Sequence, residues 1–405
     1  MTGSHMRHTR KDETMNIVTT WTGRLLGRQL QDGAACLLAA AAILGWATTA
    51  RADIKIGEIG PFSGDAAANG ASQREGIDLA VKEKNDSGGL LGQQITLVFG
   101  DDAGKPEQAI SAAKRLTSQD EVTIILGSTS SPTSAAISQV AAETETPEII
   151  TGGTAQKLTL TGNKWLFRSA VPDVKLAADL ADFIHERYPD KTKIGFVYVN
   201  DDYGKGGLDA FKARGEKIGL TVVADEKYAR GDLDFSSQLS RVKSAGAEVL
   251  VDWSRYTESA LITKQMKQMA LDIPHFGGDG QSTPKFLELA GADADGMYYA
   301  THFAVVTSAD LPAAQVFVKK FREMYHKDPD SMDAESYDAG IAAILAIEKA
   351  GSTDHTAIRD ALAKVSFDGV RGHFAFDAKG APLFAAHIVL IKEGKETNGR
   401  SGTQK

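Results

Sequence analysis

The sequence predicts an α/β protein with two lobes, each built on a doubly wound parallel sheet. Short apolar runs alternate with segments of helical periodicity along most of the 405 residues. The apolar runs are nearly unbroken, which is typical of parallel strands that helices cover on both faces. The alternation pauses near Pro172 and then starts again. We therefore expect two sheets rather than one.

The first lobe is predicted from three strand–loop–helix units. The apolar run at 54–60 precedes a glycine-rich loop, and the helical segment after it carries Ile77, Ala80 and Val81 on one face. Pro106 lies near the start of the second helix, a position that proline favours. The predicted elements are strand 54–60, helix 71–85, strand 95–99, a helix to Leu116, strand 122–126, a helix from about Pro132, and apolar runs at 147–150 and 165–168.

The second lobe repeats the pattern, and the last third of the chain is mostly helical. Helices without strands of their own must cover an existing sheet, and the late apolar run at 386–394 must join one. We therefore expect the chain to cross between the lobes more than twice. The predicted elements are strand 193–199, a helix to Ile218, strand 220–224, segment 235–245, strand 248–253, helix 256–269, strands 273–276 and 295–303, helices 311–326, 334–350 and 355–365, and strand 386–394.

An export signal is predicted at the N-terminus. The alanine-rich apolar run 36–50 follows Arg24 and Arg28 and ends in Ala50-Arg51-Ala52, the A-x-A pattern of a cleavage site. A membrane anchor is the alternative, but the run is shorter than the roughly 20 residues of a spanning helix. Cys36 is the only cysteine and opens the run, so the chain from Asp53 on has no disulfide and no thiol nucleophile. We expect a soluble periplasmic protein with residues 1–52 as its leader.

Charge and motif content argue against several classes of function. Residues 53–405 keep 39 Lys and Arg against 50 Asp and Glu, so their net charge is −11, which disfavours a nucleic-acid partner. The glycine-rich loop at 61–70 lacks G-x-G-x-x-G spacing, and no phosphate-loop motif occurs. The seven histidines after residue 52 show no H-x-x-x-H pair. We expect neither a cofactor nor a metal.

The serines at 128–134 are the possible nucleophiles, but none lies in a G-x-S-x-G turn, so several hydroxyls together indicate hydrogen bonding rather than catalysis. Asp101-Asp102 and Asp201-Asp202 follow predicted strand ends. They are either a carboxylate pair or residues that turn and solvate a loop. We expect a protein that is not an enzyme.

The predicted cleft lies at the carboxyl ends of the strands, where open α/β sheets bind ligands. Two hydroxyl-rich loops within the stretch 124–159, one of them leading into a helix, suit a small anion. Tyr203, Trp253 and Tyr256 are placed to pack against an apolar part of a ligand or, alternatively, belong to the core. Asp279, between glycines, offers one negative charge to a cation. The expected lining loops are 61–70, 127–134, 151–155, 200–206, 253–256 and 277–282.

Seven motifs follow one another in the chain from about 53 to 395: DIKIGEIGPFSGDAAANGASQREGIDLAV, ILGSTSSPTSAAIS, PEIITGGTAQKLT, FRSAVPD, NDDYGKG, GGDGQ and DGMYYATHF. With these motifs in this order, the chain resembles the periplasmic leucine/isoleucine/valine-type, or type I, substrate-binding proteins of ABC importers. The resemblance implies two α/β lobes joined by three hinge crossings, near Pro172, Thr301 and Asp377, that close on a ligand without performing chemistry. The implied lobes are 53–172 with 302–377, and 173–301 with 378–405.

The resemblance also implies which residues bind the ligand. By position, Ser131 and Thr154 correspond to the hydroxyls that take a ligand carboxylate, assisted by the main chain at Gly152 and Gly153. Tyr203 corresponds to the aromatic residue of the second lobe. The remaining implied contacts are Asp279 for an α-ammonium group and Asn69 for the ligand side chain.

Two departures concern specificity and one concerns stability. Asp279 stands where amino-acid binders carry a longer Glu, and Asn69 stands where they carry an aromatic residue. Ser130 occupies the position of a cysteine that forms a disulfide in those relatives.

The resemblance implies a small carboxylate ligand, either a branched-chain or other amino acid or an aromatic acid that has no ammonium group. It also implies an ABC membrane permease as partner and a monomeric protein. The alternatives from other classes are a periplasmic enzyme and the ligand-sensing domain of a repressor or receptor.

Overall fold

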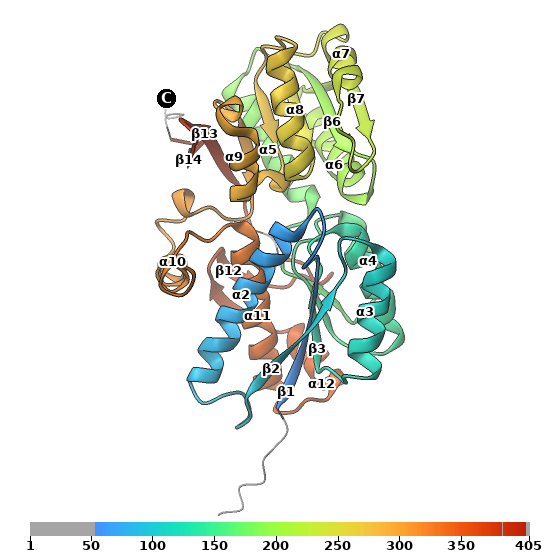
Figure 1. Ribbon diagram of the computed structural model, residues 1–405, viewed down its shortest axis with the longest axis vertical. Coiled ribbons are helices and arrows are strands. Elements are labelled where there is room, and N and C mark those ends of the chain that lie inside the picture. The colour runs from blue at the N-terminus through green and yellow to red at the C-terminus, as the bar shows by residue number, and fades with distance from the viewer. Residues whose placement is uncertain (1–52, 383, 402–405) are drawn as a thin grey trace, which may run out of the picture. The chain divides into compact units, whose positions relative to one another are not determined.

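The computed structural model describes residues 53–382 and 384–401, which form two lobes, each around its own sheet (Figure 1). The α/β class and the two parallel-stranded sheets predicted from the sequence are confirmed. The predicted signal peptide, its cleavage site and Cys36 lie outside the described residues. Across the described ranges, no helix combines the length and the apolar character that crossing a membrane requires.

The sheet of the first lobe has five parallel strands in the order β2-β1-β3-β4-β5. Successive side chains of a strand point to opposite faces. Ile56 and Ile124 therefore join one buried cluster, and Ile59 and Ile125 join another on the opposite face. The strands are β1 (Ile54–Gly60), β2 (Ile95–Asp101), β3 (Ile124–Gly127), β4 (Glu148–Ile150) and β5 (Leu166–Arg168).

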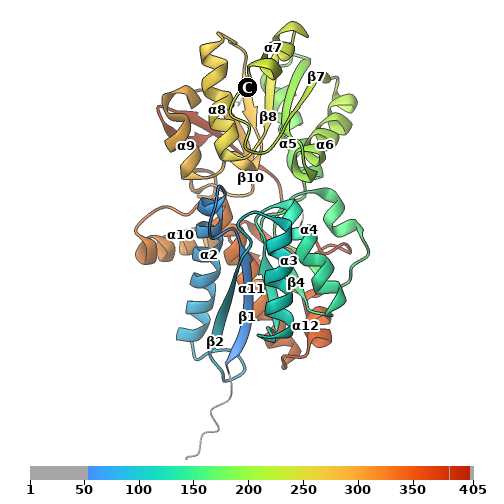
Figure 2. The ribbon, with the colours of Figure 1, turned by 45° about the vertical axis from the view of Figure 1, so that its right-hand side comes forward.

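Helices cover both faces of this sheet (Figures 1 and 2). Side chains of α2, α11 and α12 pack on one face, and those of α3 and α4 pack on the other. The late helices thus cover an existing sheet, as the sequence predicted. The helices are α2 (Ala67–Asp86), α3 (Pro106–Ser118), α4 (Ser131–Glu143), η1 (Gln156–Leu160), α11 (Ser331–Ala350) and α12 (His355–Leu362).

Two further elements belong to this part of the molecule. Helix α10 (Pro312–Tyr325) packs Phe317 and Phe321 against Leu79 of α2 and Ala334 of α11. A two-stranded antiparallel hairpin follows α12, formed by β11 (Ser366–Gly369) and β12 (Gly372–Ala375). The sequence did not predict this hairpin, because its strands are short and partly exposed and do not alternate cleanly between apolar and polar residues.

The sheet of the second lobe has seven strands in the order β14-β13-β10-β9-β8-β6-β7. The strands β6 to β10 are parallel, whereas β13 runs antiparallel to β10 and β14 antiparallel to β13. The predicted strand at 386–394 therefore joins the second lobe. The strands are β6 (Lys193–Val199), β7 (Thr221–Tyr228), β8 (Val249–Trp253), β9 (His275–Gly277), β10 (Tyr298–Thr301), β13 (His387–Lys392) and β14 (Lys395–Asn398).

Helices and short 3-10 turns complete the second lobe. Its largest core cluster includes Leu180, Phe196, Phe211, Trp253 and Phe276, which come from two helices and three strands. The helices are α5 (Asp173–Arg187), α6 (Asp202–Ile218), α7 (Ser236–Ser244), α8 (Tyr256–Gln268) and α9 (Pro284–Ala290), with the 3-10 turns η2 (Asp279–Gln281), η3 (Gly291–Ala294) and η4 (Val305–Thr307).

The five parallel strands of each lobe follow the same order, with the first strand between the second and the third. In such sheets a crevice opens where the chain switches direction, outside the carboxyl ends of the first and third strands. This rule selects the loops after β1 and β3 in one lobe and after β6 and β8 in the other.

The chain passes between the lobes three times, after β5, after β10 and after β12. A buried ion pair lies beside these crossings: Arg371 donates to Asp338 of α11 at 2.9 Å and to the carbonyl oxygen of Ser169, in the first crossing, at 3.0 Å. Ser169 in turn donates to the carbonyl oxygen of Glu335 at 2.7 Å. Helix α11 is therefore tied to the first crossing by fully buried hydrogen bonds.

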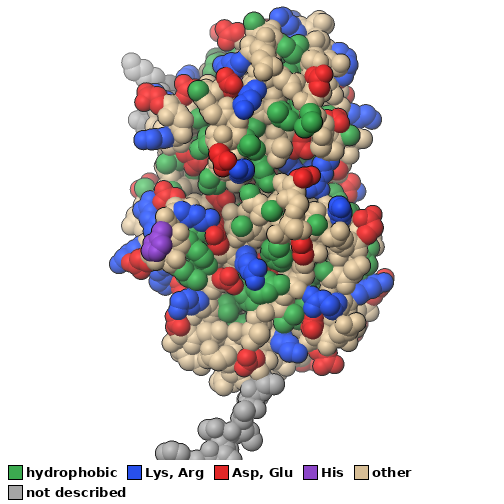
Figure 3. Space-filling view, in the orientation of Figure 1, with side chains coloured by type: hydrophobic (Ala, Val, Ile, Leu, Met, Phe, Trp, Pro, Cys, Tyr) green, Lys and Arg blue, Asp and Glu red, His purple; other side chains and the backbone are tan. Residues whose placement is uncertain are grey.

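The face of the molecule shown in Figure 3 carries Lys and Arg side chains interspersed with Asp and Glu over both lobes. Alternating signs at short range do not form the continuous basic surface on which nucleic-acid binding depends.

Candidate ligand-binding site

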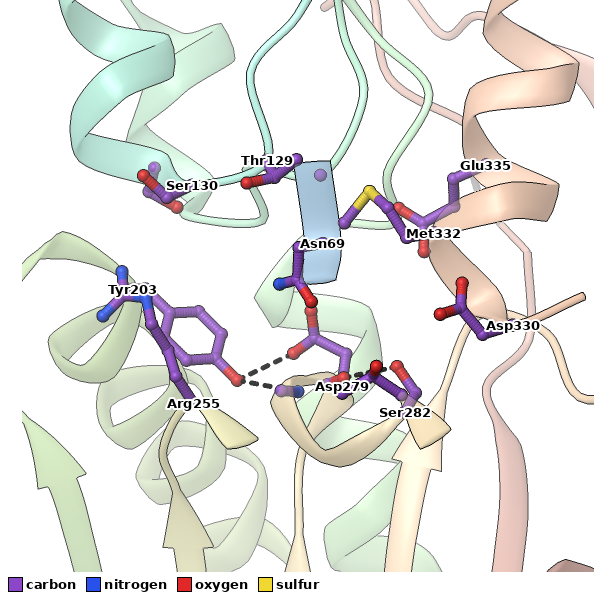
Figure 4. A pocket seen from close by; sticks show the side chains of 14 residues that line it. Asn69, Thr129, Ser130, Tyr203, Arg255, Asp279, Ser282, Asp330, Met332 and Glu335 are labelled. Carbon is purple, nitrogen blue, oxygen red and sulfur yellow. Dashed lines mark hydrogen bonds between the residues drawn. The ribbon is translucent and has the colours of Figure 1, made fainter. Parts of the chain in front are cut away.

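A cavity lies where the strand ends of the two lobes meet the start of helix α11 (Figure 4). The space between its walls is about 540 Å³ when open solvent at the mouth is included, and the part that the centre of a water-sized sphere can occupy is about 50 Å³. Its walls come from the loops after β1, β3, β4, β6, β8 and β9 and from the first turns of α11. The lining residues are Asn69, Thr129, Ser130, Ser131, Gly152, Tyr203, Arg255, Asp279, Gly280, Ser282, Thr283, Asp330, Met332 and Glu335.

The wall from the first lobe is rich in hydroxyl groups. Thr129, Ser130 and Ser131 connect β3 to α4, whose second residue is Pro132. The backbone N–H groups at a helix N-terminus have no partners within the helix and favour a negative charge nearby. The Ser131 hydroxyl oxygen accepts a hydrogen bond from Ala155 N at 3.1 Å, which leaves its own proton for another acceptor. This wall suits a carboxylate.

Gly152 brings the next loop close to this wall. A Cβ atom there would lie 2.5 Å from Cε of Met332 and 3.0 Å from the carbonyl oxygen of Thr129, so only glycine fits without displacing its neighbours. The sequence pointed to Gly153 and Thr154 in this loop. Neither lines the cavity: Thr154 is buried behind it, and its carbonyl oxygen accepts from Asp173 N at 2.9 Å.

Asp173 lies beside Thr154 at the first crossing and is fully buried. Burial raises the pKa of Asp173 well above its usual range, and the charge of Asp279 raises it further, whereas Thr154 and Arg168 oppose the shift. The Thr154 hydroxyl and this carboxyl group lie together behind the cavity, and neither has a hydrogen-bond partner among the described residues.

Tyr203 and Asp279 form the wall from the second lobe. Asp201 caps α6 by accepting from the backbone N–H groups of Tyr203 and Gly204, which fixes Tyr203 in the first turn of the helix. The Tyr203 hydroxyl donates to Oδ1 of Asp279 at 2.9 Å (Figure 4). Burial raises the pKa of Tyr203 well above its usual range, and the charge of Asp279 adds to this, so the phenol keeps its proton.

Asp279 is the acidic group at the base of the cavity. Burial raises the pKa of Asp279, the charge of His302 opposes that shift, and the charge of Glu335 adds to it. A cationic ligand group beside this carboxylate would stabilise its charged form.

Trp253 lies behind Tyr203 rather than in the cavity wall. Its side chain is fully buried at the end of β8, and its ring centre is 6.0 Å from that of Tyr203. A Cβ atom at Gly207 would lie 2.3 Å from its Nε1, so the glycine of α6 makes room for the indole. In this structure Trp253 supports Tyr203 from the core.

Of the residues predicted to bind a ligand, Asn69, Ser131, Tyr203 and Asp279 line one cavity, whereas Gly153, Thr154 and Trp253 lie behind it.

Both aspartate pairs serve the loops in which they lie. Asp101 accepts from Ser63 Oγ at 2.6 Å and from Phe62 N at 3.0 Å, and Asp102 accepts from Gly104 N at 2.7 Å. Asp201 caps α6. Within the described ranges, no group of three or more His, Cys, Asp and Glu side chains is arranged to hold a metal ion.

Arg255 lines the cavity and was not predicted, although it lies in one of the expected loops. Its Nη2 donates to Oδ2 of Asp201 at 2.9 Å, and its guanidinium carbon is 5.6 Å from the centre of the Tyr203 ring. The sequence contained enough to predict Arg255 as a lining residue, because it is a charged residue between Trp253 and Tyr256 in a strand-end loop.

The first turns of α11 contribute the other unpredicted wall, with Asp330, Met332 and Glu335. The sequence predicted this helix only from residue 334, whereas it starts at Ser331 with a capping box in which Asp330 and Asp333 bond each other's backbone N–H. The rule that ligands bind at the carboxyl ends of strands does not apply to a helix that follows a crossing. Only the capping box of Asp330 and Asp333 marked the start of this helix in the sequence.

Glu335 is almost completely buried, with 2% of its surface exposed. Its Oε1 accepts from Ser331 Oγ at 3.0 Å and is paired with Nδ1 of His302, at the second crossing. Its Oε2 has no hydrogen-bond partner among the residues that the structure describes. A buried acceptor next to a cavity is a position for a ligand donor.

Comparison with known proteins identifies the family. A model of the periplasmic binding protein family matches residues 53–395. Leu/Ile/Val-binding protein homolog 3 of Brucella melitensis is 32% identical over 332 residues, 82% of this chain and 88% of that protein.

Solved structures agree with this match. A leucine-binding protein from Thermotoga maritima is 29% identical with a TM-score of 0.81, covering 85% of this chain and 97% of that one. The branched-chain amino acid transporter substrate-binding protein of Streptococcus pneumoniae, in complex with isoleucine, is 30% identical with a TM-score of 0.78, covering 85% and 98%. The family inferred from the seven motifs is thus confirmed: the chain belongs to the Leu/Ile/Val-type periplasmic binding proteins.

Proposed function

We propose that this protein is the substrate-binding component of an ABC importer and captures an α-amino acid in the cavity between its lobes. One observation carries the proposal: the cavity has hydroxyl groups and a helix N-terminus on one side and the carboxylate of Asp279 on another. The first side suits a carboxylate and the second an ammonium group, each through charge-assisted hydrogen bonds.

The relatives support an amino acid over an aromatic acid. The Brucella protein is named for leucine, isoleucine and valine, and the Streptococcus structure holds isoleucine. An aromatic acid would leave Asp279 without a cation. The ligand contacts that we propose are Asn69, Ser131, Tyr203 and Asp279, with Gly153 and Thr154 supporting the carboxylate wall from behind and Trp253 supporting Tyr203.

The cellular location and the partner that we propose are those typical of this family. We propose that residues 1–52 direct export to the periplasm, with cleavage near Ala52, and that the protein acts as a monomer that delivers its ligand to a membrane permease. We further propose that it binds without turnover.

Isothermal titration calorimetry with a panel of amino acids and benzoate-like acids tests the proposal. We expect an amino acid to bind, and Asp279→Asn to weaken that binding by about tenfold or more, because a charge-assisted hydrogen bond contributes about 1.5–3 kcal/mol. Asp272→Asn, an exposed carboxylate of the same lobe, serves as the control and should leave the affinity unchanged. Binding of aromatic acids alone, or full affinity in Asp279→Asn, would contradict the proposal.

A further inference from the structure

We propose that the cavity selects amino acids whose side chains carry a hydrogen-bond donor and discriminates against the branched aliphatic ones. The inference rests on the function proposed above and names its substrate class. It departs from the leucine, isoleucine and valine that appear in the names of the relatives.

The first observation is the composition of the walls. Among the described residues that line the cavity, apolar carbon comes from the Met332 side chain and the Tyr203 ring, and the rest are glycines, hydroxyls, an amide and charged groups. Sites for apolar ligands are lined predominantly by hydrophobic side chains. This cavity offers a leucine or isoleucine side chain fewer apolar side chains to contact than such a site does.

The second observation is that the lining residues lie on different sides of the cavity (Figure 4). Thr129 and Ser130 lie on the side proposed for the carboxylate, and Asp279 lies at the base proposed for the ammonium group. The third side, from helix α11, carries Met332 and Glu335. Tyr203 and Arg255 line the remaining side, where Arg255 already donates to Asp201, so the side of α11 is the one that we assign to the ligand side chain.

The third observation is the state of Glu335 on that side. It points from α11 towards the cavity beside Met332 (Figure 4), it is 2% exposed, and Oε2 has no partner within the described part of the chain. The neighbouring Asp330 differs, because its oxygens already accept from Ser72 Oγ and Asp333 N. Of the two acidic side chains on this side, Glu335 is thus the one with an unpartnered oxygen for a ligand side chain.

Discrimination follows from the cost of an unpaired acceptor. Oε2 is buried without a partner among the described residues, so a valine or leucine side chain on this side would leave it unpaired, whereas a hydroxyl, amide or ammonium group would supply a hydrogen bond. A site built to hydrogen-bond a substrate group rejects an analogue of the same shape that lacks it.

Calorimetry with two pairs tests the inference: threonine against valine, which has the same shape, and lysine against norleucine, which keeps the carbon chain of lysine but lacks its ammonium group. We expect the donor-bearing member of at least one pair to bind about tenfold or more tightly than its partner. The two pairs also separate a neutral donor from a cationic one. Valine or norleucine binding as tightly as its partner in both pairs would overturn the inference while leaving the proposed function intact. If no amino acid binds at all, it is the proposed function that fails.

Variants of α11 locate the selectivity. Glu335→Gln keeps the shape of the side chain and should reduce the preference within the favoured pair several-fold. Glu348→Gln, at the other end of the same helix with 45% of its side chain exposed, is the matched control and should keep the full preference. A preference that survives Glu335→Gln unchanged would overturn the role of Glu335. The pair comparison in the unmodified protein stands whether or not this variant folds.

Discussion

A carboxyl group in the centre of the first sheet makes stability depend on pH. Glu58 of β1 is fully buried and accepts one hydrogen bond, from Nε2 of Gln73 at 3.2 Å. Burial raises the pKa of Glu58 from 4.5 to about 8, with the bond from Gln73 opposing the shift. Between these values the unfolded chain has released a proton that the folded protein retains. The free energy of unfolding therefore falls as pH rises through this window.

We predict that Glu58→Gln removes this dependence. The variant should gain stability relative to the unmodified protein as pH rises from about 4.5 to about 8, by about 2–4 kcal/mol at the upper end. Urea unfolding at a series of pH values measures the difference. Glu216→Gln, on the exposed face of α6, is the control. A difference that stays constant from pH 4 to pH 9 would contradict the prediction.

Single residues of the site were predictable where chemistry and position coincided. Ser131 and Asp279 stand in strand-end loops, and both line the cavity. Glu335 was not predictable, because it reaches the cavity only through the packing of α11 against the first lobe, about 200 residues from Ser131 in sequence. Trp253 is the opposite case. The sequence correctly placed it at a strand end beside the cavity, but its indole packs in the core, where a glycine on each side leaves room for it.

At the level of elements, the fit of helix α6 against β8 controls the position of Tyr203. Gly207 lies one turn after Tyr203, and a Cβ atom there would meet the Trp253 ring at 2.3–2.5 Å. The indole is fully buried and cannot move without disturbing the core.

We predict that Gly207→Ala destabilises the protein by about 1–3 kcal/mol through overpacking and also weakens ligand binding, because α6 must shift with Tyr203 on it. Gly215→Ala on the same helix is the matched control, since its nearest contact, the carbonyl oxygen of Leu220, would be 3.2 Å away. Thermal unfolding and calorimetry on both variants test this. Equal behaviour of the two would show that the contact with Trp253 does not hold α6 in place.

Long apolar strands were the most predictable elements. The predicted bounds of β1 and β6 are those of the structure, because both are nearly continuous apolar runs that end at a loop signal. The strand β14 and the hairpin β11–β12 were not predicted. Their strands have four residues each and are only partly buried, so tertiary contacts rather than an apolar run decide their pairing.

On the scale of the whole described part of the chain, hydrogen bonds connect the lobes around the cavity. Arg230 of the second lobe donates to the carbonyl oxygen of Gly104 in the first at 2.7 Å, and Lys157 pairs with Asp202 at 2.6 Å. The Tyr256 hydroxyl donates to the carbonyl oxygen of Asp65. These contacts exist only while the lobes are together, so they favour the state that encloses a ligand.

We predict that Arg230→Met weakens ligand binding about two- to tenfold, because it removes a hydrogen bond that only the closed arrangement makes. Calorimetry measures the affinity, and small-angle scattering of the ligand-free protein should report a larger radius of gyration. Arg241→Met is the control, since Arg241 pairs with Glu226 of its own lobe at 2.7 Å. An unchanged affinity would mean that the bond to Gly104 does not contribute to closure.

The two-lobed arrangement was predictable because the strand pattern repeats, and each repeat must bury its own sheet. The three crossings came from resemblance to a family. Local patterning cannot show which lobe a late helix joins, and this is also why the wall supplied by α11 was missed.

In that wall, the two oxygens of the Glu335 carboxyl group have different surroundings. One oxygen is bonded to His302, where the chain leaves the second lobe, and the other is buried beside the cavity without a partner among the described residues. A ligand donor that bonds to this second oxygen withdraws electron density from the one that holds His302. Ligand binding and the contact that holds the second crossing would then depend on the same carboxyl group, so the coupling between them would not have to pass through the protein core.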